Sequence, residues 1–287
     1  GGIDYRLVVR DLAPWGPYLP FPGGDTAAGA FFTQGRLAGP IDAPVLAGAA
    51  EAGDLELDGW SARTVEAGYR LTFTAPQASI DVDAVAYRVG TPTAGEFDAL
   101  RLELRQTPPT FAVALTGERP DGGAVELLAD GLVLPDGTRQ ATVQRLELDV
   151  EGRRWSLERP AFVAIGPGPD IVVRDFALIQ ADGEGRLLAD GRIAQAANDL
   201  RLTAEALPVG SILRLAGQDP IVTGELWLDA AVLGSAESPA ASVELRLVEG
   251  SFRGLRIVSF EGEAEYRGQR LVADASAALE EGAPVDV

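Results

Sequence analysis

Apolar and polar residues alternate along most of this chain, and this period of two restricts its fold more than any other feature of the sequence. Leu102 and Leu104, for example, alternate with Arg101, Glu103 and Arg105. Successive side chains of a strand point to opposite faces, so each such segment predicts a strand with one apolar and one polar face. The segments predict about 17 to 19 strands along the chain.

Asp-Gly dipeptides separate many of these segments. They begin at Asp58, Asp121, Asp130, Asp136, Asp182 and Asp190, and Gly152, Gly250, Gly262 and Gly268 fill similar places. Asp-Gly readily adopts the positive φ angles of tight hairpin turns. Short turns between alternating segments predict an all-β fold, an elongated antiparallel sheet in which the strands follow chain order.

Helix signals are scarce. Residues 208–215 predict one short helix, because Pro208 suits a first turn and Ile212, Leu213 and Leu215 form a short apolar face. Residues 14–22 contain too many prolines for a regular helix and predict a loop with aromatic side chains, among them Trp15.

An internal repeat relates residues near the start of the chain to residues 195 positions later. Each copy has a strand, a proline-containing excursion, a strand, a Gly-x4-Pro break and another strand; the matched residues are Asp4, Arg6, Leu7, Leu12, Gly29, Gly39 and Pro44 with Asp199, Arg201, Leu202, Leu207, Gly224, Gly234 and Pro239. We therefore expect residues 1–60 to end one β-repeat unit, 61–153 to continue the meander and 154–287 to form a second unit, all within one sheet of a longer protein.

Composition excludes most catalytic chemistry. The chain has 24 basic and 43 acidic residues, a net charge of −19, and neither histidine nor cysteine; every basic residue is arginine. Imidazole bases, thiolates, Schiff-base lysines and zinc ligand sets are therefore missing, and Ser211 has no histidine or lysine to activate it. The charge disfavours nucleic acid as a partner. We expect no enzyme activity, no cofactor and no metal.

Two pairs of carboxylates lie two residues apart, Asp81 with Asp83 and Asp149 with Glu151. This spacing predicts that each pair shares one face of a strand. Such pairs suit calcium binding or the acid and base of a glycosidase, but a solvated strand face also explains them.

Several short segments together resemble the TamB-like, AsmA-related proteins of the bacterial envelope. They are Trp-Ser-Leu at 155–157, Asn-Asp-Leu-Arg-Leu at 198–202, Gly-Ser-Ala-Glu-Ser-Pro at 234–239 and Val-Glu-Gly-Ser-Phe at 248–252. Residues 1–59 resemble a second copy of the latter part of this pattern. Pro40 departs from the small hydroxyl residue that the pattern has there, whereas Ser235 agrees with it.

The resemblance implies a sheet curled into a taco-like groove with an apolar interior, held at the inner membrane by a helix outside this chain. It also implies a location in the periplasm or cell envelope. The implied role is to convey phospholipids between the inner and outer membranes, or to assist outer-membrane protein assembly. The implied partners are phospholipid acyl chains and an outer-membrane β-barrel assembly partner bound through other regions.

The apolar face itself admits two interpretations. It lines such a groove, or it is the closed core of tandem β-sandwiches in a secreted or surface structural protein such as an adhesin. Trp60, Trp155 and Trp227 are either anchors facing lipid or core residues. The candidate lining residues are Leu102, Leu104, Leu146, Leu148, Trp155, Leu157, Leu200, Leu202, Leu226, Leu228, Leu245 and Leu247.

Overall fold

The computed structural model describes residues 1–18, 27–74, 77–92, 95–168, 170–215, 218–253 and 255–280. The described residues form 18 strands, one α-helix and one 3-10 helix. They divide into two compact units, Gly1–Val133 and Leu134–Val287.

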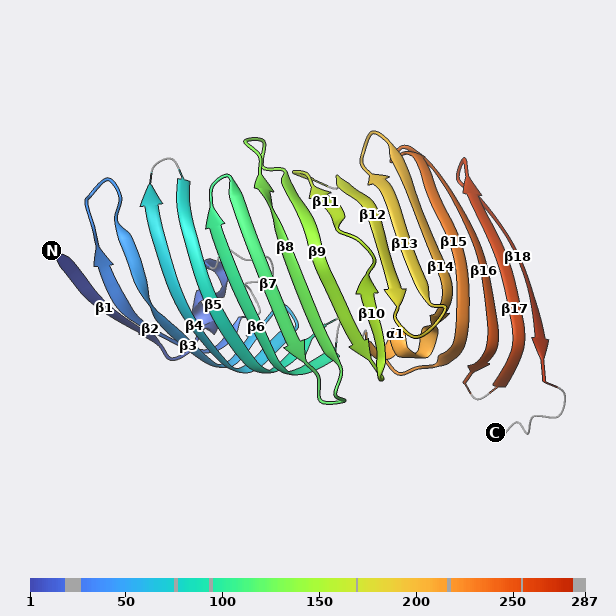
Figure 1. Cartoon of the computed structure of the whole chain (residues 1–287), viewed down its shortest axis with the longest axis horizontal. Helices are drawn as coiled ribbons and strands as arrows, with labels where there is room; N and C mark the ends of the chain where they lie inside the picture. The colour runs from blue at the N-terminus through green and yellow to red at the C-terminus, as the bar shows by residue number, and fades with distance from the viewer. Residues whose placement is uncertain are drawn as a thin grey trace. The chain divides into compact units, whose positions relative to one another are not determined.

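The first unit is an antiparallel sheet in which each strand pairs with the next one in the chain (Figure 1). Its strands are β1 (Gly2–Val9), β2 (Ala28–Ala38), β3 (Val45–Leu57), β4 (Trp60–Thr74), β5 (Gln77–Thr91), β6 (Gly95–Thr107), β7 (Thr110–Glu118) and β8 (Ala124–Val133). A 3-10 helix, η1 (Ala13–Tyr18), follows β1.

The second unit has the same plan with one irregularity. The short strands β10 and β11 each pair with both β9 and β12, and from β12 onward each strand pairs with the next. The helix α1 (Val209–Leu215) follows β14 and lies against β15. The strands are β9 (Arg139–Val150), β10 (Arg153–Leu157), β11 (Ala161–Ile165), β12 (Ile171–Gln180), β13 (Arg186–Ile193), β14 (Asn198–Pro208), β15 (Val222–Ser235), β16 (Ser238–Phe252), β17 (Leu255–Arg267) and β18 (Arg270–Leu279).

The predicted all-β fold, a curled antiparallel sheet built hairpin by hairpin with one short helix, is confirmed. The alternative of tandem β-sandwiches is wrong, because the described strands of each unit form a single layer (Figure 1). The predicted helix is also confirmed, although Pro208 ends β14 and α1 begins at Val209.

The loop predicted for residues 14–22 is wrong where it overlaps η1. Trp15 donates its backbone N–H to the Leu12 carbonyl at 2.8 Å, which closes one tight turn in spite of Pro14 and Pro17. A 3-10 helix of six residues requires few such bonds, so the prolines do not prevent it. The other residues of that prediction, 19–22, lie outside the described part of the chain.

Two of the six Asp-Gly pairs are wrong as turn predictions. Asp130 lies within β8 and Asp190 lies within β13. Two of the glycines expected in turns also lie within strands, Gly250 in β16 and Gly262 in β17. The Asp190 carboxylate instead accepts the backbone N–H of Asp175, at 3.1 Å, where β12 carries a bulge. An Asp-Gly pair whose carboxylate binds a backbone N–H at a bulge of the neighbouring strand has the same local sequence as an Asp-Gly pair in a turn.

Backbone angles support the internal repeat. Gly29 and Gly224 have φ of 112° and 120°, and each stands at a register shift between its strand and the next. Asp54 and Glu249, also 195 residues apart, have φ of 47° and 50°. The order β1, η1, β2, β3 thus recurs as β14, α1, β15, β16 with its irregularities in the same places.

The best-packed part of the first unit lies where the alternation slips by one residue. Ala62, Val89 and Phe97 are buried together, with Val65, Ala86 and Leu100 packed against them. In β4, β5 and β6 these apolar residues are three positions apart instead of two, so an extra residue enters the alternation at the same level of three neighbouring strands. Arg88, with φ of 51°, is one of these inserted residues.

We predict that Gly35→Ala destabilises the first unit by roughly 1–3 kcal/mol. A Cβ at Gly35 would collide with the Ala47 carbonyl oxygen and lie 2.8 Å from the Gly48 Cα. Gly68 is the matched control, because a Cβ there meets no atom within 4 Å. Gly68→Ala should leave stability unchanged or raise it by up to about 1 kcal/mol. Urea unfolding measures both, and equal effects would contradict this packing.

Candidate functional site

One face of the first unit carries no charged side chain in the four rows where its eight strands are paired. Residues directly opposite each other in an antiparallel pair point to the same face, so the registers define these rows. We call them the apolar face of the first unit. They are Ile3, Leu37, Leu46, Leu71, Ile80, Gln106, Phe111, Gly131; Tyr5, Gly35, Gly48, Tyr69, Val82, Leu104, Val113, Ala129; Leu7, Thr33, Ala50, Ala67, Ala84, Leu102, Leu115, Leu127; and Val9, Phe31, Ala52, Val65, Ala86, Leu100, Gly117, Val125.

The second unit has an equivalent apolar face. Its paired rows from β12 to β18 are again uncharged. They are Leu178, Leu187, Ala204, Leu228, Leu245, Gly262, Ala275; Phe176, Ala189, Leu202, Ala230, Val243, Ala264, Ala273; and Val173, Gly191, Leu200, Val232, Ala241, Tyr266, Leu271. Leu207, Leu226, Leu247, Phe260 and Ala277 extend this face.

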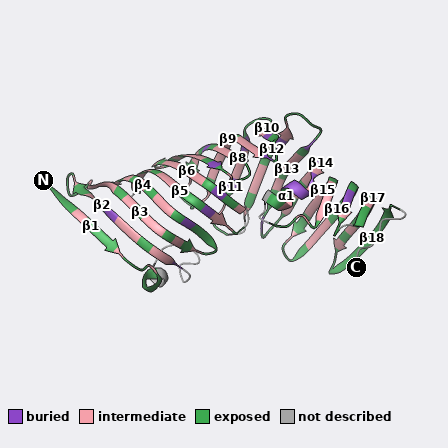
Figure 2. Cartoon of the chain, turned by 90° about the horizontal axis from the view of Figure 1, so that it is seen from below, coloured by how far each residue is buried: buried purple, intermediate pink, exposed green. Residues whose placement is uncertain are grey.

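All of the candidate lining residues lie on these two faces. Leu102 and Leu104 are on the first unit's face, and the remaining ten are on the second unit's face, where Leu148 lies opposite Trp155 and Leu157 lies opposite Leu178. Leu146 lies two residues before Leu148 on the same side of β9. Trp155 and Leu247 are buried and the others half-buried, and Figure 2 shows such half-buried residues alternating with exposed ones along the strands. The structure therefore places these side chains on one apolar face within each unit. Their contact with lipid stays a prediction.

The three tryptophans considered as anchors have different surroundings. Trp155 is buried on the apolar face, with 5% of its surface exposed, whereas Trp60 at the start of β4 is 49% exposed. Trp227 lies on the opposite, polar face, where the Arg246 guanidinium covers its ring at 4.8 Å. Trp227 is therefore neither an apolar-face anchor nor a core residue, and a cation–π contact holds it.

A polar bridge crosses the apolar face of the first unit, and the alternation did not reveal it. The Tyr5 and Tyr69 hydroxyls are hydrogen-bonded across two intervening strands, and Thr33 also contacts the Tyr69 hydroxyl. Gly35 and Gly48 lie between the tyrosines in the same row, and their missing side chains leave room for the Tyr5 hydroxyl. Burial and the hydrogen bond with Tyr69 raise the pKa of Tyr5 to about 12. The one feature of the sequence that could have indicated this bridge is the pair of glycines, which lie side by side in an otherwise apolar row.

The polar face of the second unit contains a hollow of about 660 Å³. Four carboxylates from successive strands line it in one row, Asp229, Glu244, Glu263 and Asp274, each directly opposite the next. Like charges in this arrangement repel each other. Within the described part of the chain, no three acidic side chains lie close enough together to hold a metal ion.

The carboxylate pairs singled out in the sequence differ in structure. Asp81 and Asp83 share the polar face of β5, as predicted, and Arg105 Nε lies 3.9 Å from Asp81. The prediction for Asp149 and Glu151 is wrong, because β9 ends at Val150 and Glu151 lies in the following turn with φ of 54°.

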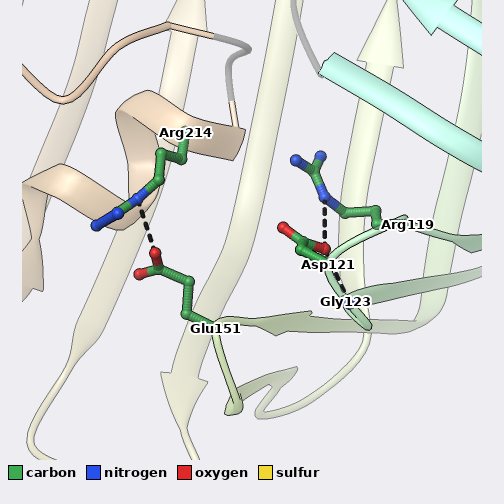
Figure 3. Close-up of polar contacts among 5 residues, drawn as sticks. All are labelled: Arg119, Asp121, Gly123, Glu151 and Arg214. Carbon is green, nitrogen blue, oxygen red and sulfur yellow. Dashed lines mark hydrogen bonds and ion pairs between the residues drawn. The ribbon is translucent and has the colours of Figure 1, made fainter.

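Glu151 instead holds α1. Its carboxylate accepts a hydrogen bond from the Ser211 hydroxyl at 2.5 Å. The same carboxylate lies 2.7 Å from Arg214 Nε, and Figure 3 draws this ion pair. These two contacts link the turn after β9 to the helix α1. In the turn between β7 and β8, Arg119 Nε lies 3.4 Å from Asp121. Figure 3 marks this ion pair as well.

Comparison with known proteins gives no match to a family model, to a curated protein or to a solved structure. Among the residues that the structure describes, no helix is both long enough and apolar enough to cross a membrane.

We predict that Leu202→Glu lowers the free energy of unfolding by about 2–4 kcal/mol, because it places an unpaired carboxylate among apolar neighbours. Arg201→Leu, one residue away on the exposed polar face, should change it by less than about 0.5 kcal/mol. Leu148→Glu and Glu147→Leu form a second matched pair. Chemical denaturation followed by circular dichroism measures all four, and equal tolerance at both sets of positions would show that the faces are wrongly assigned.

A charge reversal within the acidic row should stabilise the second unit. Glu244 lies between Asp229 and Glu263, so Glu244→Arg replaces two repulsions by two attractions and should raise the free energy of unfolding by about 0.5–2 kcal/mol at low salt. Glu265, opposite Ser242 and Val272, is the control for the same reversal. The difference in the free energy of unfolding between the two variants should shrink in roughly 0.5–1 M salt, because salt screens the interactions between exposed charges. A stabilisation that salt does not change would show that row repulsion is not its cause.

Proposed function

We propose that the two apolar faces bind phospholipid acyl chains, and that the chain is a non-catalytic segment of an envelope-spanning β-groove protein. The observation that carries this proposal is the continuity of the uncharged rows. In the first unit they run through every strand from β1 to β8, and no described strand of that unit forms a second layer over them.

Burial of an acyl chain on such a surface is favourable by roughly 0.8 kcal/mol for each methylene group removed from water. Ala50, Ala67 and Ala84 lie side by side across three strands, so small side chains give part of this surface low relief. An uncharged surface offers a headgroup no strong ionic contact, so a chain is free to slide along it. The charged groups lie on the opposite face, where salt bridges such as Arg105 with Asp81 occur.

The resemblance to TamB-like, AsmA-related proteins supports this proposal. In such a protein the segment conveys phospholipids between the inner and outer membranes, or assists outer-membrane protein assembly through a partner bound by other regions, in the periplasm. The proposal requires no catalytic group or cofactor, because partitioning of acyl chains between water and an apolar face needs no chemistry.

Site-specific photocross-linking tests the proposal directly. Benzoylphenylalanine is placed at Leu115 on the apolar face or at Thr116, the next residue of β7, on the polar face; Leu245 and Glu244 form the equivalent pair in β16. After irradiation in a bacterial host, we expect phospholipid adducts in the intact mass spectrum at Leu115 and Leu245 and not at their neighbours.

Two outcomes would overturn the proposal. Adducts at equal yield from both faces would indicate non-specific contact with lipid. No adduct at either apolar position, in variants whose circular dichroism matches that of the unmodified chain, would show that these faces do not hold lipid.

A further inference from the structure

The hydroxyls of the polar bridge, those of Tyr5, Tyr69 and Thr33, donate their hydrogen bonds in one direction. The Thr33 hydroxyl donates its only proton to the Ala49 carbonyl oxygen at 2.9 Å. It therefore accepts from the Tyr69 hydroxyl, which lies 2.5 Å away. Tyr69 then has no proton left for Tyr5, so Tyr5 donates to Tyr69. Because a hydroxyl has one proton and two acceptor lone pairs, all three protons are used within the bridge.

The polar bridge consequently offers a ligand acceptors but no donor. No described residue donates a hydrogen bond to the Tyr5 oxygen, which ends the series. Burial and the bond with Tyr69 raise the pKa of Tyr5 to about 12, so its phenol stays protonated at neutral pH. Gln106, the other polar side chain in the four rows, lies on β6, two strands beyond β4. A phosphate or ester oxygen would meet only other oxygens at the bridge.

The Tyr5 hydroxyl lies inside the sheet, over β2 and β3. A Cβ at Gly35 or Gly48 would lie 2.6 Å or 2.9 Å from it. Apolar side chains of the same strands and of β4 flank it in the rows on either side, namely Leu37, Leu46, Leu71, Ala50 and Ala67. A lipid whose acyl chains lie on these rows brings its headgroup within reach of the bridge.

The second unit shows that the repeated fold does not require these hydroxyls. The counterparts of Gly35, Gly48 and Tyr69, 195 residues later in the chain, pair in the same order and are all apolar. They are Ala230, Val243 and Ala264, and the residue opposite Ala230 is Leu202. The polar bridge is therefore specific to the first unit, and the formation of the sheet does not explain it.

We propose that the polar bridge binds the primary ammonium group of a zwitterionic phospholipid, such as one with an ethanolamine headgroup. This inference rests on the proposed function, because the acyl chains of that lipid lie on the apolar face of the first unit. A primary ammonium group donates hydrogen bonds and accepts none, which matches a site that only accepts. The hydroxyls of an anionic headgroup also donate, but the net charge of −19 disfavours a lipid with net negative charge.

Photocross-linking with matched lipids tests this inference on the whole chain. Benzoylphenylalanine replaces Leu71, two residues from Tyr69 on the apolar face of β4, or Leu245 on the apolar face of the second unit as the control. Each variant is mixed with equimolar dioleoyl phosphatidylethanolamine and dioleoyl phosphatidylcholine, which differ only in the methylation of the headgroup nitrogen. We expect adducts of the ethanolamine lipid to exceed those of the choline lipid at least about fivefold at Leu71, and equal yields at Leu245.

A double variant, Tyr5→Phe with Tyr69→Phe, tests the hydroxyls themselves. Both oxygens are removed because Tyr5→Phe alone would leave the Tyr69 oxygen as a free acceptor. The preference at Leu71 should fall to a ratio of about one. The summed yield should stay within about twofold, because the apolar surface is kept. Tyr87→Phe, on the opposite face of β5, is the matched control and should leave the preference unchanged.

An N,N-dimethyl ethanolamine lipid tests the donor without changing the protein, and it decides the matter if the double variant does not fold. It keeps one N–H, so its yield at Leu71 should lie between those of the other two lipids. A yield no higher than that of the choline lipid would overturn the inference. Equal ethanolamine and choline yields at Leu71, or a preference that a folded double variant keeps, would also overturn it and leave lipid binding standing. No adduct with any of the lipids at either position would overturn the proposed function as well.

Discussion

The antiparallel backbone ladder is the interaction on which each unit of this protein depends. A single-layered sheet has no second layer to bury its apolar face, and no large side chain among the described residues is fully buried. Stability therefore comes from long ladders, such as the pairing of β4 with β5, and from side chains that contact their neighbours within one face. Hydrophobic burial contributes only partially, because most apolar residues bury one side against adjacent strands and leave the other exposed.

This constraint explains several local features. Where the alternation slips in β4, β5 and β6, apolar residues gather at one level, and Val89 and Phe97 become the best-buried apolar side chains larger than alanine in the first unit. The link from Tyr5 to Tyr69 joins β1 to β4 across two glycines, so a hydrogen bond supplements the ladders where bulky side chains are missing. In the second unit Glu151 connects a hairpin turn to α1 through Ser211 and Arg214.

The same constraint connects the fold to the proposed roles. An apolar face without a second layer is a continuous low-polarity surface, which suits a passive contact with acyl chains better than it suits catalysis.

The period of two in the sequence determined the strands, the all-β class and the face on which residues such as Leu102 and Leu202 lie, because side-chain direction in a strand follows position alone. Local chemistry also determined α1 to within one residue. Only the tertiary structure decided what depends on neighbours distant in sequence. Asp190 serves a bulge in β12 rather than a turn, Trp227 is held by Arg246 on the polar face, and Glu151 binds α1 instead of sharing a strand face with Asp149. The Tyr5–Tyr69 bridge and the row of four carboxylates arise from the register between strands, which no single strand encodes.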